Sequence, residues 1–282
     1  MDINYICSLG MNCHTASFLK SNNLKLASYP FDWIFSDSKI ILNCLNNNFN
    51  IFLDKLYYLN NKNKTGGHKL YGENMFFHHN PLTNPEDYNY FTRCVERFRN
   101  LLKITEPKLF ITTYLNINNI DETIKTIIDF NNSFKKYTIN YRLLVILNIS
   151  NQKTNYHKYT TVDNIDLLEL HTLSSSTGIK FTNNTDNIYL LNTIKDKYSF
   201  NLRPIFHNKS KIVEPSKHVE PSKRVEPSKR VEPSKHVEPS KRVEPSKRVE
   251  PSKHIQQPLI NNSTLSAIRS KKINPFFQLK FN

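Results

Sequence analysis

Short apolar runs alternate with longer amphipathic segments along the chain before residue 210. The short runs have the length of buried strands, and the longer segments repeat their apolar residues with the period of a helix. Apolar strands that alternate with helices predict an α/β fold, a three-layer sandwich in which helices cover both faces of a mostly parallel sheet. The pattern predicts strands at residues 3–9, 74–78, 108–115, 142–149, 180–182 and 188–191, and helices at residues 13–21, 37–45, 85–103, 121–136 and 163–173.

The pattern changes at residue 213, where the hexapeptide Val-Glu-Pro-Ser-Lys-Arg/His begins seven tandem repeats that end at residue 254. One Val in six residues offers too little apolar surface to offset the entropy of ordering, so the repeats are predicted to be a disordered tail. The expected organisation is a globular domain at residues 1–210, the repeats at 213–254 and a polar, basic tail at 255–282. Tandem repeats in a chain rich in Asn, Lys and Ile suggest an AT-rich source such as a large DNA virus.

The formal net charge of +15 is shared between the two parts of the chain. Each repeat pairs one Glu with one Lys, and four of the seven repeats add an Arg, so the repeats carry +4 and the remainder carries +11. A basic domain without a nucleic-acid motif is expected to make only weak, salt-sensitive contacts with polyanions.

Several classes of protein are excluded by what the sequence lacks. It has no phosphate-binding glycine loop, no dinucleotide fingerprint and no metal-ligand spacing, so neither a cofactor nor a metal is expected. No apolar run approaches the roughly 18 residues of a membrane span, and the N-terminus has no signal-peptide pattern. The four cysteines lack the spacing of a disulfide framework. We therefore expect an intracellular, non-secreted protein, in the host cytoplasm if its source is viral.

Cys13 is the strongest candidate for chemistry among the four cysteines. It follows Gly10 and Asn12 at the expected start of a helix, where free N–H groups and the helix dipole favour a thiolate nucleophile. Cys44 and Cys94 fall on apolar helix faces, and Cys7 falls within the first strand, so these three are expected to be core residues. The alternative for Cys13 is a helix-capping or buried structural thiol.

A thiol nucleophile needs a base, and the adjacent His14 is poorly placed because neighbouring helix residues point about 100° apart. We expect His14 to be exposed. His78 and His79, at the end of a predicted strand, are better sources of an imidazole. Because adjacent strand residues face opposite ways, only one of the two can reach the thiol.

Further polar residues complete the candidate site. Asp32 lies within an aromatic cluster and needs a partner, so it is the first choice to orient the imidazole, with Asp87 as an alternative. Asn12 is a candidate for an oxyanion-hole amide. Arg93 and Arg97 lie four residues apart on one helix face and are candidates for binding a substrate phosphate or carboxylate, although a solvated basic face would look the same.

Four motifs together resemble a known but uncharacterised family, described as putative papain-like cysteine peptidases. They are S-L-G-x-N-C-x-x-A-x-x-L-K at residues 8–20, Y-P-F-D-W at 29–33, F-x-H at 76–78 and R-x-x-x-R-F at 93–98. The F-x-H element aligns Phe76 with His78, so the resemblance selects His78 as the base and leaves His79 second. The resemblance also implies the alternative fold, a papain-like α+β arrangement. One departure is that relatives carry an Arg near the end of the strand matching residues 110–113, where this chain has Thr.

The sequence therefore predicts a cysteine-dependent hydrolase or transferase that acts on an acyl or amide bond, with a peptide among its candidate substrates. Cys13 attacks, His78 takes and returns the proton, and Asp32 orients His78. The alternative is a catalytically inactive, basic binding module with a multivalent repeat tail.

Overall fold

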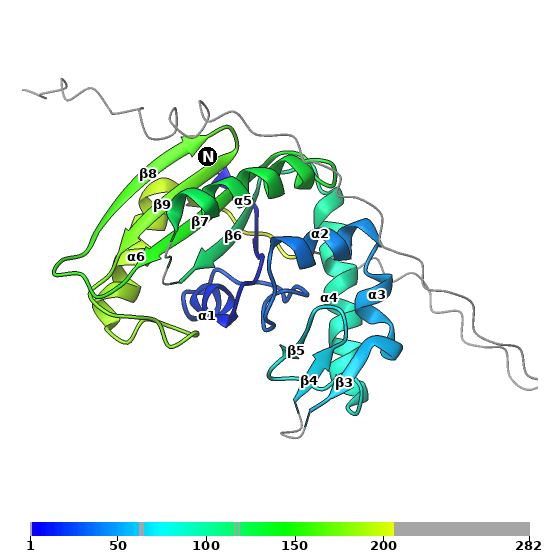
Figure 1. Cartoon of the computed structure of the whole chain (residues 1–282). Coiled ribbons are helices and arrows are strands. Elements are labelled where there is room, and N and C mark those ends of the chain that lie inside the picture. The colour runs from blue at the N-terminus through cyan, green and yellow to red at the C-terminus, as the bar shows by residue number, and fades with distance from the viewer. Residues whose placement is uncertain (1, 62–64, 116, 118, 206–282) are drawn as a thin grey trace, which may run out of the picture. The chain divides into compact units, whose positions relative to one another are not determined.

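A five-stranded sheet forms the centre of the structure, a computed structural model that describes residues 2–61, 65–115, 117 and 119–205 (Figure 1). The strands lie in the spatial order β2–β6–β7–β9–β8. Neighbours pair in parallel except at one edge, where β8 runs antiparallel to β9. The bounds are β2 Tyr5–Ser8, β6 Lys108–Tyr114, β7 Tyr141–Ile149, β8 Tyr156–Val162 and β9 Ile165–His171.

Successive residues of the central strands face opposite sides of the sheet and enter different cores. In β6, Leu109 and Ile111 pack in one apolar cluster and Phe110 in the other. In β7, Leu144 and Val145 divide in the same way. Strands that bury both faces read as unbroken apolar runs, which is why the sequence predicts them well.

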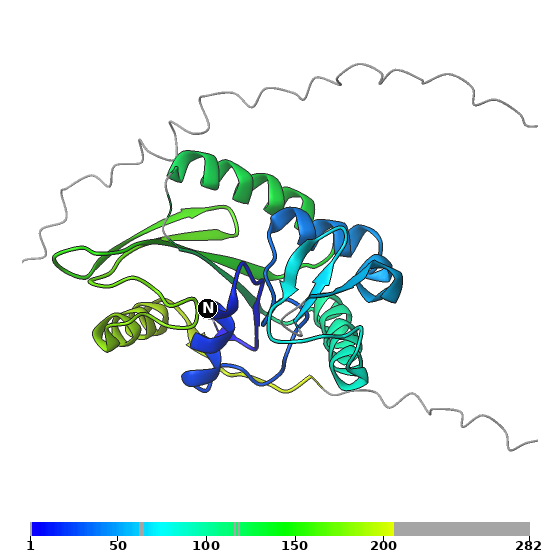
Figure 2. The same cartoon turned by 60° about the horizontal axis from the view of Figure 1, so that its bottom comes forward.

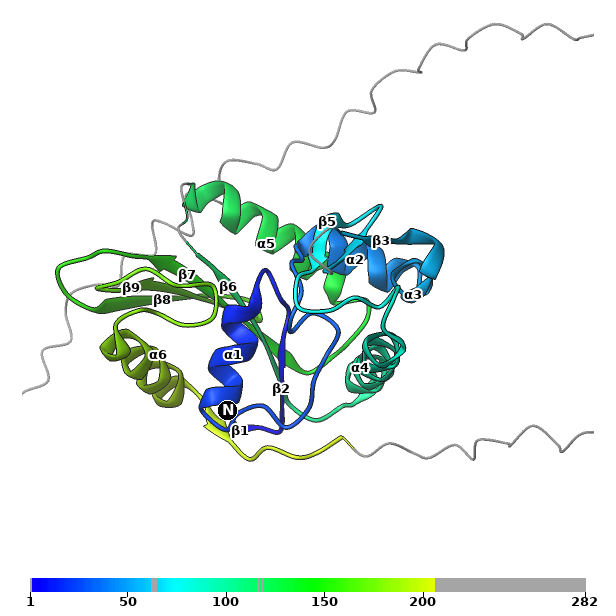
Figure 3. The ribbon, with the colours of Figure 1, turned by 90° about the horizontal axis from the view of Figure 1, so that it is seen from below.

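Helices cover the two faces. Helices α1 (Cys13–Ser21) and α6 (Asn184–Lys197) pack on one face, whereas α2 (Ser38–Asn46), α4 (Pro85–Lys103) and α5 (Ile120–Phe134) bury their apolar residues in the cluster of the other. Figures 2 and 3 show α5 on the opposite side of the sheet from α1 and α6. The predicted three-layer sandwich with a mostly parallel sheet is confirmed.

A second, antiparallel sheet of three short strands lies beside α3 and α4 (Figure 1). Its strands follow one another in the order β3–β4–β5. Of the residues predicted as a strand at 74–78, residues 74–76 belong to β5, and His78 and His79 follow this strand. The remaining elements are α3 (Asn50–Leu53), a 3-10 helix (Lys55–Tyr57), β3 (Tyr58–Asn60), β4 (Gly66–His68), β5 (Gly72–Phe76), and the parallel pair β1 (Asp2–Ile3) and β10 (Ser199–Phe200).

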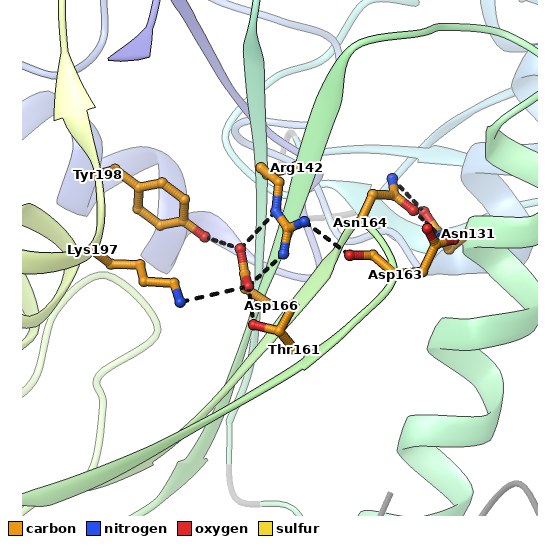
Figure 4. Close-up of polar contacts among 8 residues, drawn as sticks. All are labelled: Asn131, Arg142, Thr161, Asp163, Asn164, Asp166, Lys197 and Tyr198. Carbon is orange, nitrogen blue, oxygen red and sulfur yellow. Dashed lines mark hydrogen bonds and ion pairs between the residues drawn. The ribbon is translucent and has the colours of Figure 1, made fainter. Parts of the chain in front are cut away.

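A buried carboxylate, Asp166, lies near the amino ends of the central strands, where it is held by several hydrogen bonds (Figure 4). Asp166 in β9 is 1 % exposed and accepts hydrogen bonds from the Arg142 guanidinium at 2.9 and 2.5 Å. Thr161 and Tyr198 each donate a hydroxyl to it at 2.6 Å. Burial alone would raise the pKa of Asp166, but these hydrogen bonds and the charge of Arg142 outweigh it, and the pKa is lowered. The network is fully paired and joins β7, β8, β9 and the end of α6.

Three predicted elements after residue 150 are wrong. Residues 163–173, predicted as a helix, form a tight turn and β9, because Asp163 adopts a φ of 56° and lets β8 pair back on β9. Residues 188–191, predicted as a strand, lie inside α6. Residues 180–182 contribute only an isolated bridge between Ser176 and Phe181.

The predicted globular domain contains all the described residues, and the repeats and the tail lie outside them. No helix in the described part of the chain has the length and the apolar character needed to cross a membrane.

Candidate active site

The turn between β2 and α1 places Cys13 beyond the carboxyl end of the parallel sheet. The Leu9 amide still pairs with the Ile111 carbonyl at 2.8 Å, after which Gly10 and Met11 both adopt positive φ angles, 79° and 75°. A Cβ on Gly10 would lie 2.1 Å from the Ser36 hydroxyl, so only glycine fits the turn. The reversal makes Cys13 the first residue of α1.

The Cys13 thiol is buried in the structure. Its exposed fraction is 8 %, and in the described part of the chain no hydrogen bond is recorded for its sulfur. Burial raises the pKa of the thiol, and the negative charge of Asp32 raises it further. The prediction that the helix start would lower this pKa is therefore wrong for the free protein, because loss of solvation dominates.

His14 is buried, not exposed as predicted. The residue is 1 % exposed, Nδ1 of its ring lies 2.6 Å from the Ser176 hydroxyl, and the ring makes an edge contact with Phe181 at 4.7 Å between centroids. Burial lowers the pKa of His14 to about 4, so the ring is neutral near pH 7. Its hydrogen bond goes to Ser176 and not to the neighbouring thiol.

His79 is paired with the alternative carboxylate, Asp87. Nδ1 of His79 lies 2.9 Å from Oδ1 of Asp87, and the other carboxylate oxygen accepts the Asn80 amide at 2.8 Å. The ring stacks on Tyr90 with centroids 5.1 Å apart. His78 is exposed, and its recorded contact is with the ring of Phe77. The structure thus brings His79 and Asp87 together, but not His78 and Asp32.

Asp32, the first choice to orient the imidazole, forms a buried ion pair instead. Its carboxylate is 1 % exposed and lies 2.6 Å from the Lys25 ammonium, and it also accepts the Tyr29 amide at 2.8 Å. Burial raises the pKa of Asp32, while Lys25 and the Tyr29 amide act in the opposite direction. The sequence argument that this charge needs a partner is sound, but the partner is a lysine.

Residues 31–36 connect the turn that carries Cys13 to the strand that precedes the two histidines. The Met11 amide donates to the Ser36 hydroxyl at 3.3 Å, and the Phe35 amide donates to the Met75 carbonyl at 3.1 Å. These two regions are therefore joined by one short segment. Among the described residues, no hydrogen bond links Cys13 to either histidine.

The remaining candidates have separate roles. Asn12 caps α1, because its side-chain oxygen accepts the His14 amide at 2.9 Å. The Arg97 guanidinium donates to the Ser28 carbonyl, and Arg93 is exposed. The two arginines are not brought together on one group in this structure.

Sequence reasoning missed three residues of this region. Lys25 partners Asp32, Ser176 partners His14, and Tyr90 supports the His79 ring. Ser176 is 162 positions from His14, so no local pattern could join them. Near the end of β6, the Thr113 hydroxyl is hydrogen-bonded to Thr15 of α1 at 2.8 Å.

Among the described residues, no group of three or more His, Cys, Asp or Glu side chains could hold a metal ion. A family model described as "Putative papain-like cysteine peptidase (DUF1796)" matches residues 4–151, about half of the chain. This match includes every candidate site residue named from the sequence. No curated protein and no solved structure matches the chain.

Proposed function

The chain belongs to the family of putative papain-like cysteine peptidases, and on that premise we propose that it is a cysteine-dependent hydrolase acting on an acyl or amide bond, such as that of a peptide. One observation carries the proposal. Cys13 is the first residue of α1, immediately beyond the carboxyl end of β2, which is where α/β folds place their reactive groups. The other three cysteines are fully buried in strand or helix faces, with exposed fractions of 0–1 %.

His79 is the better of the two candidate bases. The Asp87 carboxylate beside Nδ1 favours the tautomer in which Nδ1–H donates to Asp87 and Nε2 is the nitrogen that can accept a proton. The pair is partly exposed, with 20 % of each side chain accessible, so a substrate can reach it. A carboxylate that orients an imidazole is the support that a thiol nucleophile requires.

The proposed reaction begins when Nε2 of His79 accepts the proton of the Cys13 thiol. The sulfur attacks the carbonyl carbon, and the tetrahedral intermediate collapses as the imidazolium gives its proton to the leaving group. Water, deprotonated by the same imidazole, then attacks the thioester carbon, the C–S bond breaks and the carboxylic acid leaves, and the imidazolium returns its proton to the sulfur to restore the thiol.

The test is covalent trapping with an activated ester, p-nitrophenyl acetate, followed by mass spectrometry of the intact protein and of its peptides. We expect one acetyl group on Cys13 and release of p-nitrophenol. Cys13→Ala should abolish both, whereas Cys44→Ala, which removes a buried thiol on α2, should abolish neither. Acetylation of another residue in preference to Cys13 would exclude Cys13 as the nucleophile.

A catalytically inactive binding module remains the second candidate function. The observation in its favour is that the Cys13 thiol has no imidazole partner among the described residues, while its pKa is raised. The same experiment separates the two functions, since an inactive module would release p-nitrophenol no faster with the wild-type chain than with Cys13→Ala.

A further inference from the structure

A basic cavity of about 340 Å³ opens beside the carboxyl end of α1, away from the thiol at the other end of that helix. Three cationic residues line it, Lys20 from α1, Lys25 from the following loop and Arg97 from α4. The indole of Trp33 forms part of the wall. We call this cavity the basic pocket.

Lys25 lines the basic pocket, but its ammonium is already paired and is not free to bind a ligand. Its ammonium donates to the Ala27 carbonyl at 2.8 Å and to the Ser28 hydroxyl at 2.9 Å, and it lies 2.6 Å from the Asp32 carboxylate. An ammonium has three donors, so all are used. Asp32 also cancels the charge of Lys25, and the ion pair fixes the loop that carries Ala27 and Ser28.

Lys20 and Arg97 keep unused hydrogen-bond donors, and neither has a carboxylate within ion-pair distance among the described residues. The Lys20 ammonium lies 6.0 Å from the centre of the Trp33 ring, and no hydrogen bond or ion pair is recorded for it in the described part of the chain. Arg97 donates one of its five N–H groups to the Ser28 carbonyl. Because Asp32 offsets Lys25, these two residues give the basic pocket a net charge of +2.

We propose that the basic pocket binds the phosphate group of a small phosphorylated molecule. A phosphate ester carries a charge of about −2 near pH 7, which matches the charge of the pocket better than a carboxylate does. The fork of the Arg97 guanidinium suits two oxygens of one phosphate, and Lys20 supplies a point charge from the other side. Trp33 offers an apolar surface for the rest of the molecule. The site does not depend on the chemistry of Cys13.

Trp33 is the single tryptophan of the chain and reports directly on the basic pocket. The experiment titrates the full-length protein with inorganic phosphate, with phenyl phosphate and with sodium acetate at constant ionic strength, and follows tryptophan fluorescence. We expect both phosphates to change the emission saturably, with phenyl phosphate binding more tightly because its ring contacts Trp33. Acetate should require at least about tenfold higher concentration.

Two variants and a matched control locate the site. Arg97→Gln and Lys20→Gln should each weaken phosphate binding about tenfold. Arg93→Gln removes the same charge from the same helix at an exposed position outside the pocket, and should leave binding unchanged. Circular dichroism verifies that each variant is folded.

Three outcomes would overturn the proposal. They are an emission that does not respond to either phosphate, an equal loss of affinity in Arg93→Gln and Lys20→Gln, and acetate binding as tight as that of phosphate. The second would indicate non-specific attraction to a basic surface, and the third a carboxylate site.

Discussion

Two histidines of this protein occupy opposite kinds of environment. His14, at the start of α1, is 1 % exposed, has a hydroxyl from Ser176 as its partner and has a pKa lowered to about 4. His79, beyond β5, is partly exposed and has the carboxylate of Asp87 as its partner. The histidine next to the thiol in sequence is therefore kept neutral by burial, whereas the distant one has the support expected of a base.

The difference shows that a histidine next to a cysteine in the sequence need not have the partners that a base requires. A buried imidazole without a carboxylate has no group to stabilise the imidazolium that proton transfer creates. An imidazole held by Asp87 and stacked on Tyr90 keeps one orientation and can carry a positive charge. His14 is consequently a structural residue, and His79 is the one we assign to proton transfer.

Replacing His79 tests this assignment most directly, because we expect it to cause the largest loss of activity. His79→Gln should lower kcat/KM toward an activated ester by about 10²–10⁴-fold, the usual contribution of a general base. His78→Gln removes the neighbouring ring, which has no carboxylate partner in the described structure, and should have a much smaller effect. Steady-state hydrolysis rates of the two variants are compared directly. A larger loss in His78→Gln would restore the assignment made from the F-x-H motif.

The second effect concerns the dependence of stability on pH. Because the pKa of His14 is about 4 in the folded protein and near 6.5 when unfolded, the unfolded chain binds a proton first as the pH falls. Stability should be unaffected above pH 6.5 and should decrease between about pH 6.5 and pH 4, by up to about 3 kcal/mol. Urea unfolding across this range should show a flatter curve for His14→Phe than for the wild type.

The exposed His78 provides the matched control for that measurement, because its side chain is outside the core. His78→Gln should retain the wild-type pH dependence. An identical pH dependence in His14→Phe and the wild type would show that His14 is not the group responsible.

The central sheet and its helices could be predicted from the sequence as far as residue 149. The strands there are buried on both faces, and helices such as α4 have a clear apolar stripe, with Phe91, Val95 and Phe98 on it. After residue 149 the sequence pattern predicts the wrong element at several positions. Ile188 and Tyr189 favour a strand by composition, but they lie in a helix that Asn183 caps and Asp186 supports in its first turn.

The candidate site was only partly predictable. Cys13 could be placed at the start of α1 because Gly10 and Asn12 mark a turn and a helix cap. The partners of the polar groups could not be placed, because they are set by packing. Nothing in the sequence near Asp32 distinguishes a bond to Lys25 from a bond to a histidine, and only the fold brings Tyr90 against His79.

The third effect is a slow reaction of the free thiol. Since burial and Asp32 raise the pKa of Cys13, its thiolate fraction at pH 7 is lower than that of an ordinary thiol, and alkylation by iodoacetamide should be at least about tenfold slower than that of glutathione. The rate should rise with pH beyond pH 9.

Cys13 should still react before the other three cysteines, because its exposed fraction of 8 % is the largest among them. Peptide mapping after timed alkylation measures this order, and earlier labelling of another cysteine would contradict it. A rate plateau at neutral pH would contradict the raised pKa.

The smallest effect separates the two roles open to Asn12 at the same turn. Asn12→Ala removes the oxygen that accepts the His14 amide and should destabilise the fold by about 1 kcal/mol, as loss of a helix cap does. Asn12→Ser keeps a capping oxygen but removes the side-chain amide.

If Asn12 is only a cap, Asn12→Ser should match the wild type in both urea unfolding and ester hydrolysis. An unchanged stability with a 10²–10³-fold lower kcat would instead assign the amide to the oxyanion hole, since that is the cost of losing one such donor. Because Asn12 is adjacent to Cys13, this pair of variants also tests whether the turn at α1 serves the fold or the reaction.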